Sequence, residues 1–275
     1  MKIIKSELVL GVEKPFTFLQ TSDTHFVFTD ETDTQRRREF ARDRFRIFPH
    51  AEENAAFIRQ YVAETGYPIV HTGDLMDFIT PANLRFCREF VRETGMMMVA
   101  GNHEQAICVN DVFCPEDFKG DLDCRDEILD DVQTYFENDI RFTCREIGGV
   151  NFVGIDNGNY QISSVQFEKL KNVVAEGKPI LLFMHIPLYS RELQARHYDC
   201  YLAPPEDVLA TYGPWQVYEQ KADEQTLEAC QYIRSQELIK YVICGHLHLN
   251  HETQTPGEIK QIVTGLDTLR EITVR

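Results

Sequence analysis

The chain has 275 residues, of which 43% are hydrophobic and 26% are charged, and its formal net charge is -16. This length and composition suit a single α/β domain with a sizeable core. The negative charge argues against nonspecific binding of nucleic acid or of an anionic membrane surface. It does not exclude an anionic substrate, because bound divalent metal ions would reverse the sign of the charge locally.

The sequence contains no segment that we interpret as a signal peptide or a membrane span. Its eight cysteines are scattered and form no C-x-x-C pair, which favours reduced thiols and a cytoplasmic location. Cys108, Cys114 and Cys124 form a loose cluster. A zinc site there is the less favoured interpretation, because the spacing matches no common zinc motif.

Apolar runs in the first half of the chain predict alternating strands and helices. We expect an edge strand over residues 1–10, strands over 16–20, 68–71 and 96–99, and helices over 49–65 and 80–94. From residue 16 the order is β-α-β-α-β, which implies parallel neighbouring strands with helices packed on the sheet.

The second half predicts a loop over 108–120, a helix over 121–138 and a hairpin of 140–147 with 150–155. Asp156 and Asn157 end the hairpin, and we expect them near the site. Ser163 to Gln166 resembles a capping box that opens a helix ending near 176. Further strands are expected over 179–184, 241–244, 259–264 and 269–274, with a helix over 222–235.

Two segments interrupt this pattern, and we interpret them as insertions, at about 26–48 and 186–222, in a single domain spanning 1–275. The first is a solvated helix or loop with internal salt bridges, or an arm that grips phosphate through the bidentate fork of arginine. The second is long and aromatic, and is either a lid or a surface excursion. The arginines of the first insertion are Arg36, Arg37, Arg38, Arg42, Arg44 and Arg46.

Five apolar runs each end in Asp, Asn or His, at the edge where open α/β sheets bind ligands. Imidazole with carboxylate suits Zn, Mn, Fe, Co or Ni rather than calcium. Seven ligands are too many for one such ion and suit two that share a carboxylate, about 3.5–4 Å apart. The candidate ligands are Asp23, His25, Asp74, Asn102, His185, His246 and His248.

Each motif alone has a structural explanation. Asp23-x-His25 occurs by chance, Gly73-Asp74 is often only a turn, and His185 suits a core histidine. Their joint occurrence at successive strand ends favours a metal centre. A pair of such ions deprotonates a bridging water near neutral pH and clamps an anionic oxygen, which suits hydrolysis of phosphoesters.

The motif series resembles that of the calcineurin-like metallophosphoesterases. The resemblance implies a four-layer αββα sandwich, in which two mixed β-sheets are flanked by helices and two metals lie at one edge. It implies a metal-bridging hydroxide as nucleophile, His103 as the general acid and Asp77 as the carboxylate that orients it. The matching motifs are Asp23-x-His25, Gly73-Asp74-x-x-Asp77, Gly101-Asn102-His103-Glu104, His185 and Gly245-His246-x-His248.

By the same resemblance, Asp23, His25 and His248 hold the first metal. The second metal is held by Asn102, His185 and His246, and Asp74 bridges the two. The cofactors implied are two divalent transition-metal ions, namely Mn, Fe, Zn or Ni.

The sequence departs from the family at two positions. Phe78 stands where the family often has an arginine that holds the substrate phosphate, which disfavours the protein-phosphatase branch. Asp77 stands where purple acid phosphatases have a ligand tyrosine, so we expect no tyrosinate-iron chromophore.

Three functions are compatible with this site. The first is a phosphatase or phosphodiesterase acting on small phosphoesters. The second is a nuclease of the same family, which the acidic composition disfavours. The third is a non-catalytic scaffold that keeps the fold, which the complete ligand set disfavours. The oligomeric state is left open.

Overall fold

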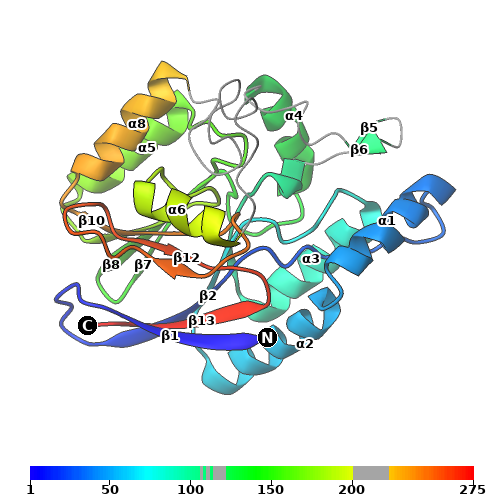
Figure 1. Ribbon diagram of the computed structural model, residues 1–275, viewed down its shortest axis with the longest axis horizontal. Helices are drawn as coiled ribbons and strands as arrows, with labels where there is room; N and C mark the ends of the chain where they lie inside the picture. The colour runs from blue at the N-terminus through cyan, green and yellow to red at the C-terminus, as the bar shows by residue number, and fades with distance from the viewer. Residues whose placement is uncertain (106–107, 110–111, 114–121, 201–222) are drawn as a thin grey trace.

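The architecture is two mixed β-sheets stacked face to face with helices on both outer faces (Figure 1), which confirms the predicted αββα sandwich. The computed structural model describes residues 1–105, 108–109, 112–113, 122–200 and 223–275. For residues 106–125 it describes no side chains. The candidate cysteine cluster of Cys108, Cys114 and Cys124 therefore lies outside the described side chains.

The first sheet has five strands in the order β1-β13-β2-β3-β4. As predicted, β2, β3 and β4 are parallel and β1 lies at the edge. The first and last strands of the chain are neighbours here, because β1 and β13 pair in parallel along their whole length, so the two termini lie at opposite ends of this pair (Figure 1). The strands are β1 (Lys2–Leu8), β2 (Phe16–Thr21), β3 (Ile69–Thr72), β4 (Met97–Val99) and β13 (Thr268–Val274).

The second sheet has six strands in the order β11-β12-β10-β9-β8-β7. The expected hairpin forms between β7 and β8, and β8, β9 and β10 run parallel. The short strand β11 was not predicted. The strands are β7 (Phe142–Ile147), β8 (Val150–Ile155), β9 (Ile180–Phe183), β10 (Ile239–Cys244), β11 (His251–Glu252) and β12 (Gln261–Val263).

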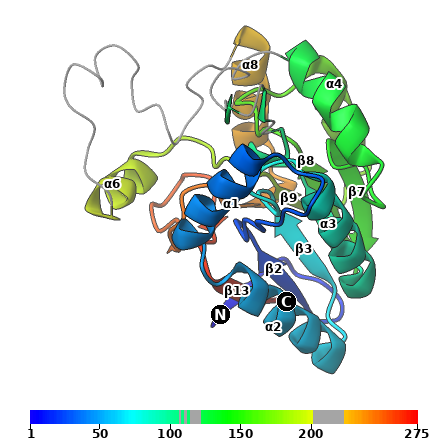
Figure 2. The same ribbon diagram turned by 90° about the vertical axis from the view of Figure 1, so that its right-hand side faces the viewer.

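Helices cover the outer face of each sheet. α2 (Ala51–Thr65), α3 (Pro81–Thr94) and α4 (Leu122–Gln133) pack on the first sheet (Figure 2), and α5 (Ser164–Ala175) and α8 (Glu224–Ser235) pack on the second. The predicted capping box of Ser163 and Gln166 opens α5. Among the described helices, none is both long enough and apolar enough to cross a bilayer.

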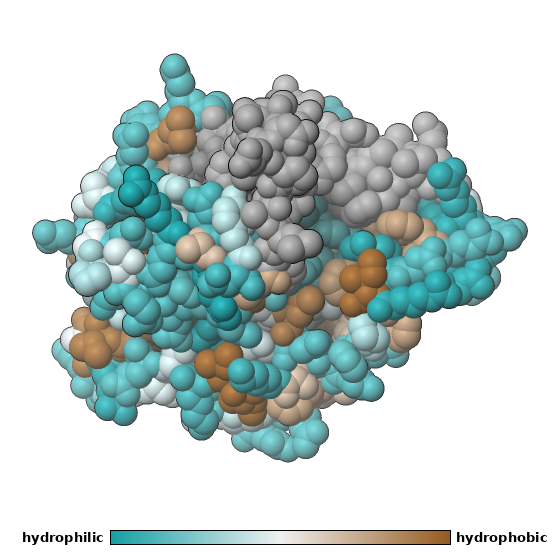
Figure 3. All heavy atoms as spheres, in the orientation of Figure 1, coloured by the Kyte–Doolittle hydropathy of each residue, from teal (hydrophilic) through white to brown (hydrophobic). Residues whose placement is uncertain are grey.

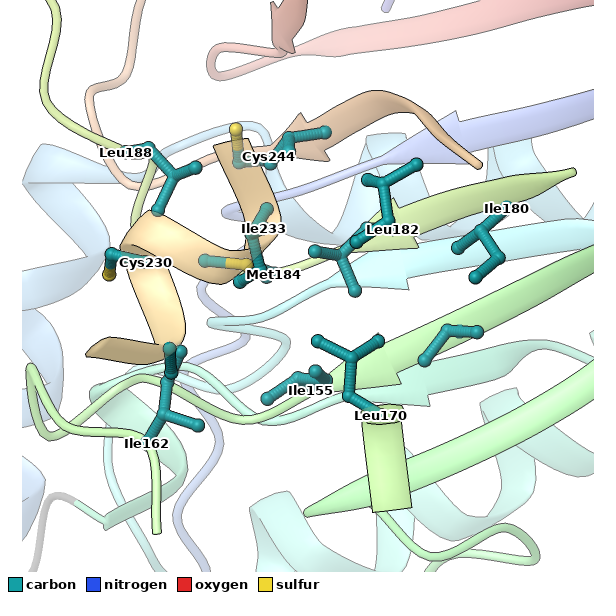
Figure 4. Close-up of a cluster of buried hydrophobic side chains, with 14 of the residues drawn as sticks. Ile155, Ile162, Leu170, Ile180, Leu182, Met184, Leu188, Cys230, Ile233 and Cys244 are labelled. Atoms are coloured by element: carbon teal, nitrogen blue, oxygen red, sulfur yellow. The ribbon is translucent and has the colours of Figure 1, made fainter. Parts of the chain in front are cut away.

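Aromatic and aliphatic side chains fill the space between the layers. Between the sheets, the ring centroid of Phe152 lies 4.8 Å from that of Phe18 and 5.2 Å from that of Phe183. Under α5 and α8, Leu170 and Ile233 face the second sheet (Figure 4). Burying each such large side chain contributes about 2–3 kcal/mol, so both sheets are held rigidly at the edge that carries the site.

Both predicted insertions contain helices. The segment at 26–48 forms α1 (Gln35–Ile47), whose N-cap is Thr34. The segment at 186–222, interpreted as a lid or a surface excursion, contains a helix that was not predicted, α6 (Arg191–Cys200), where Leu193 and His197, four residues apart, give a buried face. Residues 201–222, the remainder of that insertion, lie outside the described part of the chain.

The loop expected at 108–120 contains two short strands, β5 (Cys108–Val109) and β6 (Val112–Phe113), which pair as an antiparallel ladder. The rest of that segment is outside the described residues. The short helix η1 (His103–Gln105) precedes it.

A candidate metal centre

The predicted site residues all follow strands whose carboxyl ends meet at one edge of the sandwich. Backbone hydrogen bonds join the segments that follow these strands: Asp23 N donates to Gly73 O, and Gly245 N donates to His185 O, each at 3.0 Å. The site is therefore built from both sheets. The structure brings all seven candidate ligands into two adjoining clusters.

The backbone of these segments is conformationally unusual. Seven described residues other than glycine have positive φ, and five of them are candidate ligands. Non-glycine residues adopt this region rarely and at an energetic cost, so such residues concentrate at functional sites. The five ligands are Asp23, His25, Asp74, His246 and His248.

The first cluster contains Asp23, His25 and His248. The Nε2 atoms of His25 and His248 lie 3.2 Å apart, and Nε2 of His248 lies 3.4 Å from Oδ1 of Asp23. Nε2 of His25 lies 3.7 Å from Oδ2 of Asp74. Two side chains from the segment after β2 and one from the segment after β10 thus direct donor atoms at one point beside Asp74.

The second cluster contains Asn102, His185 and His246. Oδ1 of Asn102 lies 3.0 Å from Nε2 of His185 and 3.1 Å from Nδ1 of His246. These two nitrogens are 3.2 Å apart, and Nε2 of His185 lies 3.2 Å from Oδ2 of Asp74. The same oxygen of Asp74 therefore faces both clusters.

The donor atoms fit divalent metal ions. Atoms about 2.0–2.2 Å from one ion lie roughly 3–3.5 Å from each other, and the spacings within both clusters match this value. The tautomers agree as well: Nδ1 of His185 donates to the carbonyl of Thr72 at 2.8 Å, which leaves Nε2 directed at the cluster. Fixing the outer nitrogen in this way is typical of metal-binding histidines.

The electrostatics of the buried groups also call for positive charge. Burial disfavours the charge on Asp74, but the imidazoles of His185 and His103 outweigh it and hold the pKa of Asp74 well below its ordinary value. Although burial lowers the pKa of His185, Asp74 raises it to about 10. Burial and the charge of Asp74 raise the pKa of Glu104 to about 7. A bound cation would compensate this concentration of carboxylates.

His103 lies beside the shared carboxylate, with Nε2 3.9 Å from Oδ2 of Asp74. Its Nδ1 donates to the backbone carbonyl of Asp77 at 2.5 Å and lies 3.4 Å from Oδ1 of the Asp77 side chain. The nearest imidazole to the Asp77 carboxylate is instead that of His25, whose Nδ1 lies 3.0 Å from Oδ1. Asp77 thus contacts both histidines, His103 chiefly through its main chain.

Two residues of the loop after β8 contact the second cluster. Oδ1 of Asn157 accepts hydrogen bonds from the backbone N–H groups of His185 and Ile186, so Asn157 lies near the site as expected. The hydroxyl of Tyr160 lies 3.3 Å from Nε2 of His246. Sequence reasoning missed Tyr160, because a tyrosine in a polar loop carries no local signal of this contact.

The glycines of the motifs allow close packing around the ligands. A Cβ at Gly101 would collide with the side chain and backbone of Asp74, and one at Gly245 would collide with Ser22 and Asp23. Gly73 has a φ of +94° and packs against the ring of His185. Each glycine therefore permits a contact that brings a candidate ligand into place.

The layered α/β fold and the candidate metal ligands are those expected of a metal-dependent hydrolase. The chain belongs to the calcineurin-like phosphoesterase family, whose model matches residues 16–250. This range contains every candidate ligand, and the family is dinuclear and metal-dependent.

Several solved structures are similar to this chain. A dimetal phosphatase from Danio rerio is 14% identical, covers 91% of this chain and 87% of its own, and has a TM-score of 0.46. A phosphopantetheinyl hydrolase from Mycobacterium tuberculosis is 15% identical, with coverages of 90% and 89% and a TM-score of 0.43. The purple acid phosphatase PPD1 from yellow lupin is 14% identical, with coverages of 94% and 44% and a TM-score of 0.48. No curated protein matches the chain.

Proposed function

We propose that this protein hydrolyses small phosphoesters, as a phosphatase or phosphodiesterase, with two divalent transition-metal ions. Asp23, His25 and His248 would hold one ion, and Asp74 would contribute to both. The single observation that supports this most strongly is that Oδ2 of Asp74 faces two separate donor clusters. The second ion would be held by Asn102, His185 and His246.

When bound, such a pair of ions activates a water molecule and neutralises the phosphate oxygens. Hydrolysis joins the water oxygen to phosphorus as the bond to the leaving oxygen breaks, and the leaving oxygen takes a proton. We assign that proton to Nε2 of His103, whose ring is anchored through Nδ1 to the Asp77 carbonyl. The Asp77 carboxylate, whose Oδ1 lies 3.4 Å from the same nitrogen, also helps to orient the ring.

Two observations favour this function over the alternatives. The net charge of -16 disfavours a nuclease that tracks a polyanion. The complete donor set disfavours a non-catalytic scaffold. We also propose a single domain spanning 1–275, since both sheets contribute ligands, and a cytoplasmic location, since the cysteines with described side chains are free.

A substrate panel tests the proposal. The protein would be stripped with EDTA, reloaded with Mn²⁺, Fe²⁺, Zn²⁺ or Ni²⁺, and assayed on p-nitrophenyl phosphate, bis-p-nitrophenyl phosphate, cyclic nucleotides and a phosphopeptide. We expect turnover of a small mono- or diester that EDTA abolishes and one of these metals restores. Salt-sensitive cutting of DNA without small-ester turnover would establish the nuclease instead. Freshly purified protein without stoichiometric metal would support the scaffold.

A further inference from the structure

Arg44, on the helix α1, forms a two-point ion pair with the buried carboxylate of Asp77. Its Nε lies 2.7 Å from Oδ2 and its second terminal nitrogen lies 2.8 Å from Oδ1. The Asp77 side chain is fully buried, and that of Arg44 is 21% exposed. A bidentate pair fixes the plane of a carboxylate as well as its position.

This pair differs from two other ion pairs of α1. Arg46 bonds to Asp43 at 3.0 Å with both side chains more than two-thirds exposed, and Arg42 lies 3.8 Å from Glu39. Pairs of this kind between neighbouring helix turns are worth little. The projecting part of α1 is largely hydrophilic (Figure 3), as the expectation of a solvated arginine helix requires. Arg44 alone among these three arginines reaches away from the helix into the site.

The ion pair continues into the first metal cluster. Oδ1 of Asp77, which accepts from Arg44, also accepts from Nδ1 of His25 at 3.0 Å. A proton held on Nδ1 leaves Nε2 of His25 to face the cluster. Phe48 stacks on the face of the His25 ring, with a centroid distance of 4.0 Å and an interplanar angle of 8°.

Arg44 also supports that stacked ring. Its Cζ lies 5.1 Å from the centroid of Phe48. Two contacts of Arg44, one ionic and one with an aromatic face, therefore converge on His25.

We propose that Arg44 is a positioning residue for the metal site of His25: through Asp77 and Phe48 it fixes the ring and tautomer of that ligand, and so sets the affinity of the first site without affecting the second. This inference rests on the proposed function in that both clusters hold metal ions. It also assigns a role within the arginine-rich insertion. With Nε and a terminal nitrogen engaged by Asp77, Arg44 acts on a ligand rather than on the substrate phosphate.

Mn²⁺ binding tests the proposal without reference to turnover. Isothermal titration of the EDTA-stripped protein would compare wild type with Arg44→Met, Arg44→Lys and the matched control Arg46→Met. Arg44→Met should weaken one of two Mn²⁺ sites by about 10–100-fold, the usual effect of losing an outer partner of a ligand. The Mn²⁺ affinity of Arg44→Lys should lie between those of wild type and Arg44→Met, because an ammonium group keeps the positive charge but not the bidentate geometry. Arg46→Met should match wild type.

Double variants assign the affected site. His185→Asn should weaken the second site, and adding Arg44→Met to it should still weaken Mn²⁺ binding at the first site. His248→Asn should weaken the first site, and adding Arg44→Met to it should change Mn²⁺ binding at the second site little. Circular dichroism would establish that each metal-free variant is folded. If Arg44→Met does not fold, the comparison of Arg44→Lys with wild type tests the proposal instead.

Several results would overturn the proposal. Equal Mn²⁺ affinities in Arg44→Met and wild type would show that Arg44 does not position the ligand. Equal weakening of both sites would indicate a general effect on the fold. A raised KM for a phosphoester with unchanged Mn²⁺ binding would place Arg44 on the substrate instead. Wild-type protein that fails to bind two Mn²⁺ ions would overturn the proposed function as well. The results on the Arg44 variants concern the positioning role alone, so the two proposals fail in different measurements.

Discussion

The carboxylate of Glu104 accepts a hydrogen bond from the backbone N–H of Asp74, with 2.8 Å between Oε2 and N. The same side chain accepts from Leu75 at 2.8 Å and from Gly101 at 2.7 Å. Glu104 is fully buried, so one carboxylate ties the segment after β3 to the segment after β4. These bonds hold Asp74 at a φ of +58°, a conformation that an aspartate does not otherwise favour.

Glu104→Gln should therefore destabilise the fold and the metal site together. An amide offers one acceptor oxygen where the carboxylate offers two, and its NH₂ group would face backbone donors. Leaving buried donors unpaired costs about 2–3 kcal/mol, which urea denaturation would measure. Glu93→Gln, at an exposed pair with Arg59, is the control and should cost under about 0.5 kcal/mol. Equal unfolding free energies for the two variants would contradict this role.

Asp74→Asn should abolish turnover and lower the metal content below two ions per chain. The amide keeps one oxygen but loses the negative charge, and its NH₂ nitrogen cannot bind a metal ion as a carboxylate oxygen does. Metal analysis after gel filtration, with turnover measured on the same sample, checks this. Asp43→Asn, an exposed site on α1, should retain both. An Asp74→Asn protein with two tightly held ions and normal turnover would rule out a shared carboxylate.

His103→Gln should keep the metals and lower turnover by about 10²–10⁴-fold, the usual contribution of a general acid. The loss should be largest for esters with poor leaving groups, because these need the proton most. Rates on an alkyl phosphate and on p-nitrophenyl phosphate provide the comparison, with His50→Gln at an exposed histidine as the control. Full turnover of the alkyl ester by His103→Gln would remove His103 from this role.

Tyr160→Phe should weaken metal binding at the second cluster alone. The hydroxyl lies 3.3 Å from Nε2 of His246, where it can accept the ring N–H and leave Nδ1 directed at the cluster. The phenyl ring still fills the buried space, so the fold should be intact. Mn²⁺ titration should show about a tenfold loss at one site. Tyr189→Phe, whose hydroxyl contacts Gln194, should show none, and an equal effect in both variants would exclude a specific role.

Glu192 should make the attachment of α6 dependent on pH. It accepts hydrogen bonds from the backbone of Gln254 and Thr255, and it lies 2.9 Å from Nε2 of His251. Burial raises the pKa of Glu192. The hydrogen bonds from the Thr255 hydroxyl and from the backbone N–H groups of Gln254 and Thr255 outweigh burial and lower this pKa below the ordinary 4.5. The stabilisation is therefore present above about pH 4.5 and lost as the pH falls below it.

Glu192→Gln should accordingly cost about 1–2 kcal/mol of unfolding free energy at pH 7, and the difference from wild type should shrink towards pH 3.5. Urea denaturation at several pH values measures both. Glu237→Gln, on the turn after α8, should show no such trend. A Glu192→Gln cost that stayed constant from pH 7 to 3.5 would show that its ionisation contributes nothing.

The sequence alone predicted the layered α/β fold, because apolar periodicity and helix caps are local properties of the chain. The strands that carry the site, the β7–β8 hairpin and the capping box of α5 were all predicted in this way. The helix α6 was missed because its apolar face is short, and the surrounding aromatic, proline-containing segment is typical of a loop.

The sequence also determined which side chains were available at the strand ends, since the residue types and their order along the chain are enough to nominate metal ligands. The resemblance to a known family implied how they divide about Asp74, and only the tertiary structure decided that His103 is anchored by a main-chain carbonyl and that Arg44 pairs with Asp77, 33 positions away. Such contacts depend on how loops from different strands cross one edge of the sandwich. No local pattern encodes that crossing, because it is set by the packing of both sheets.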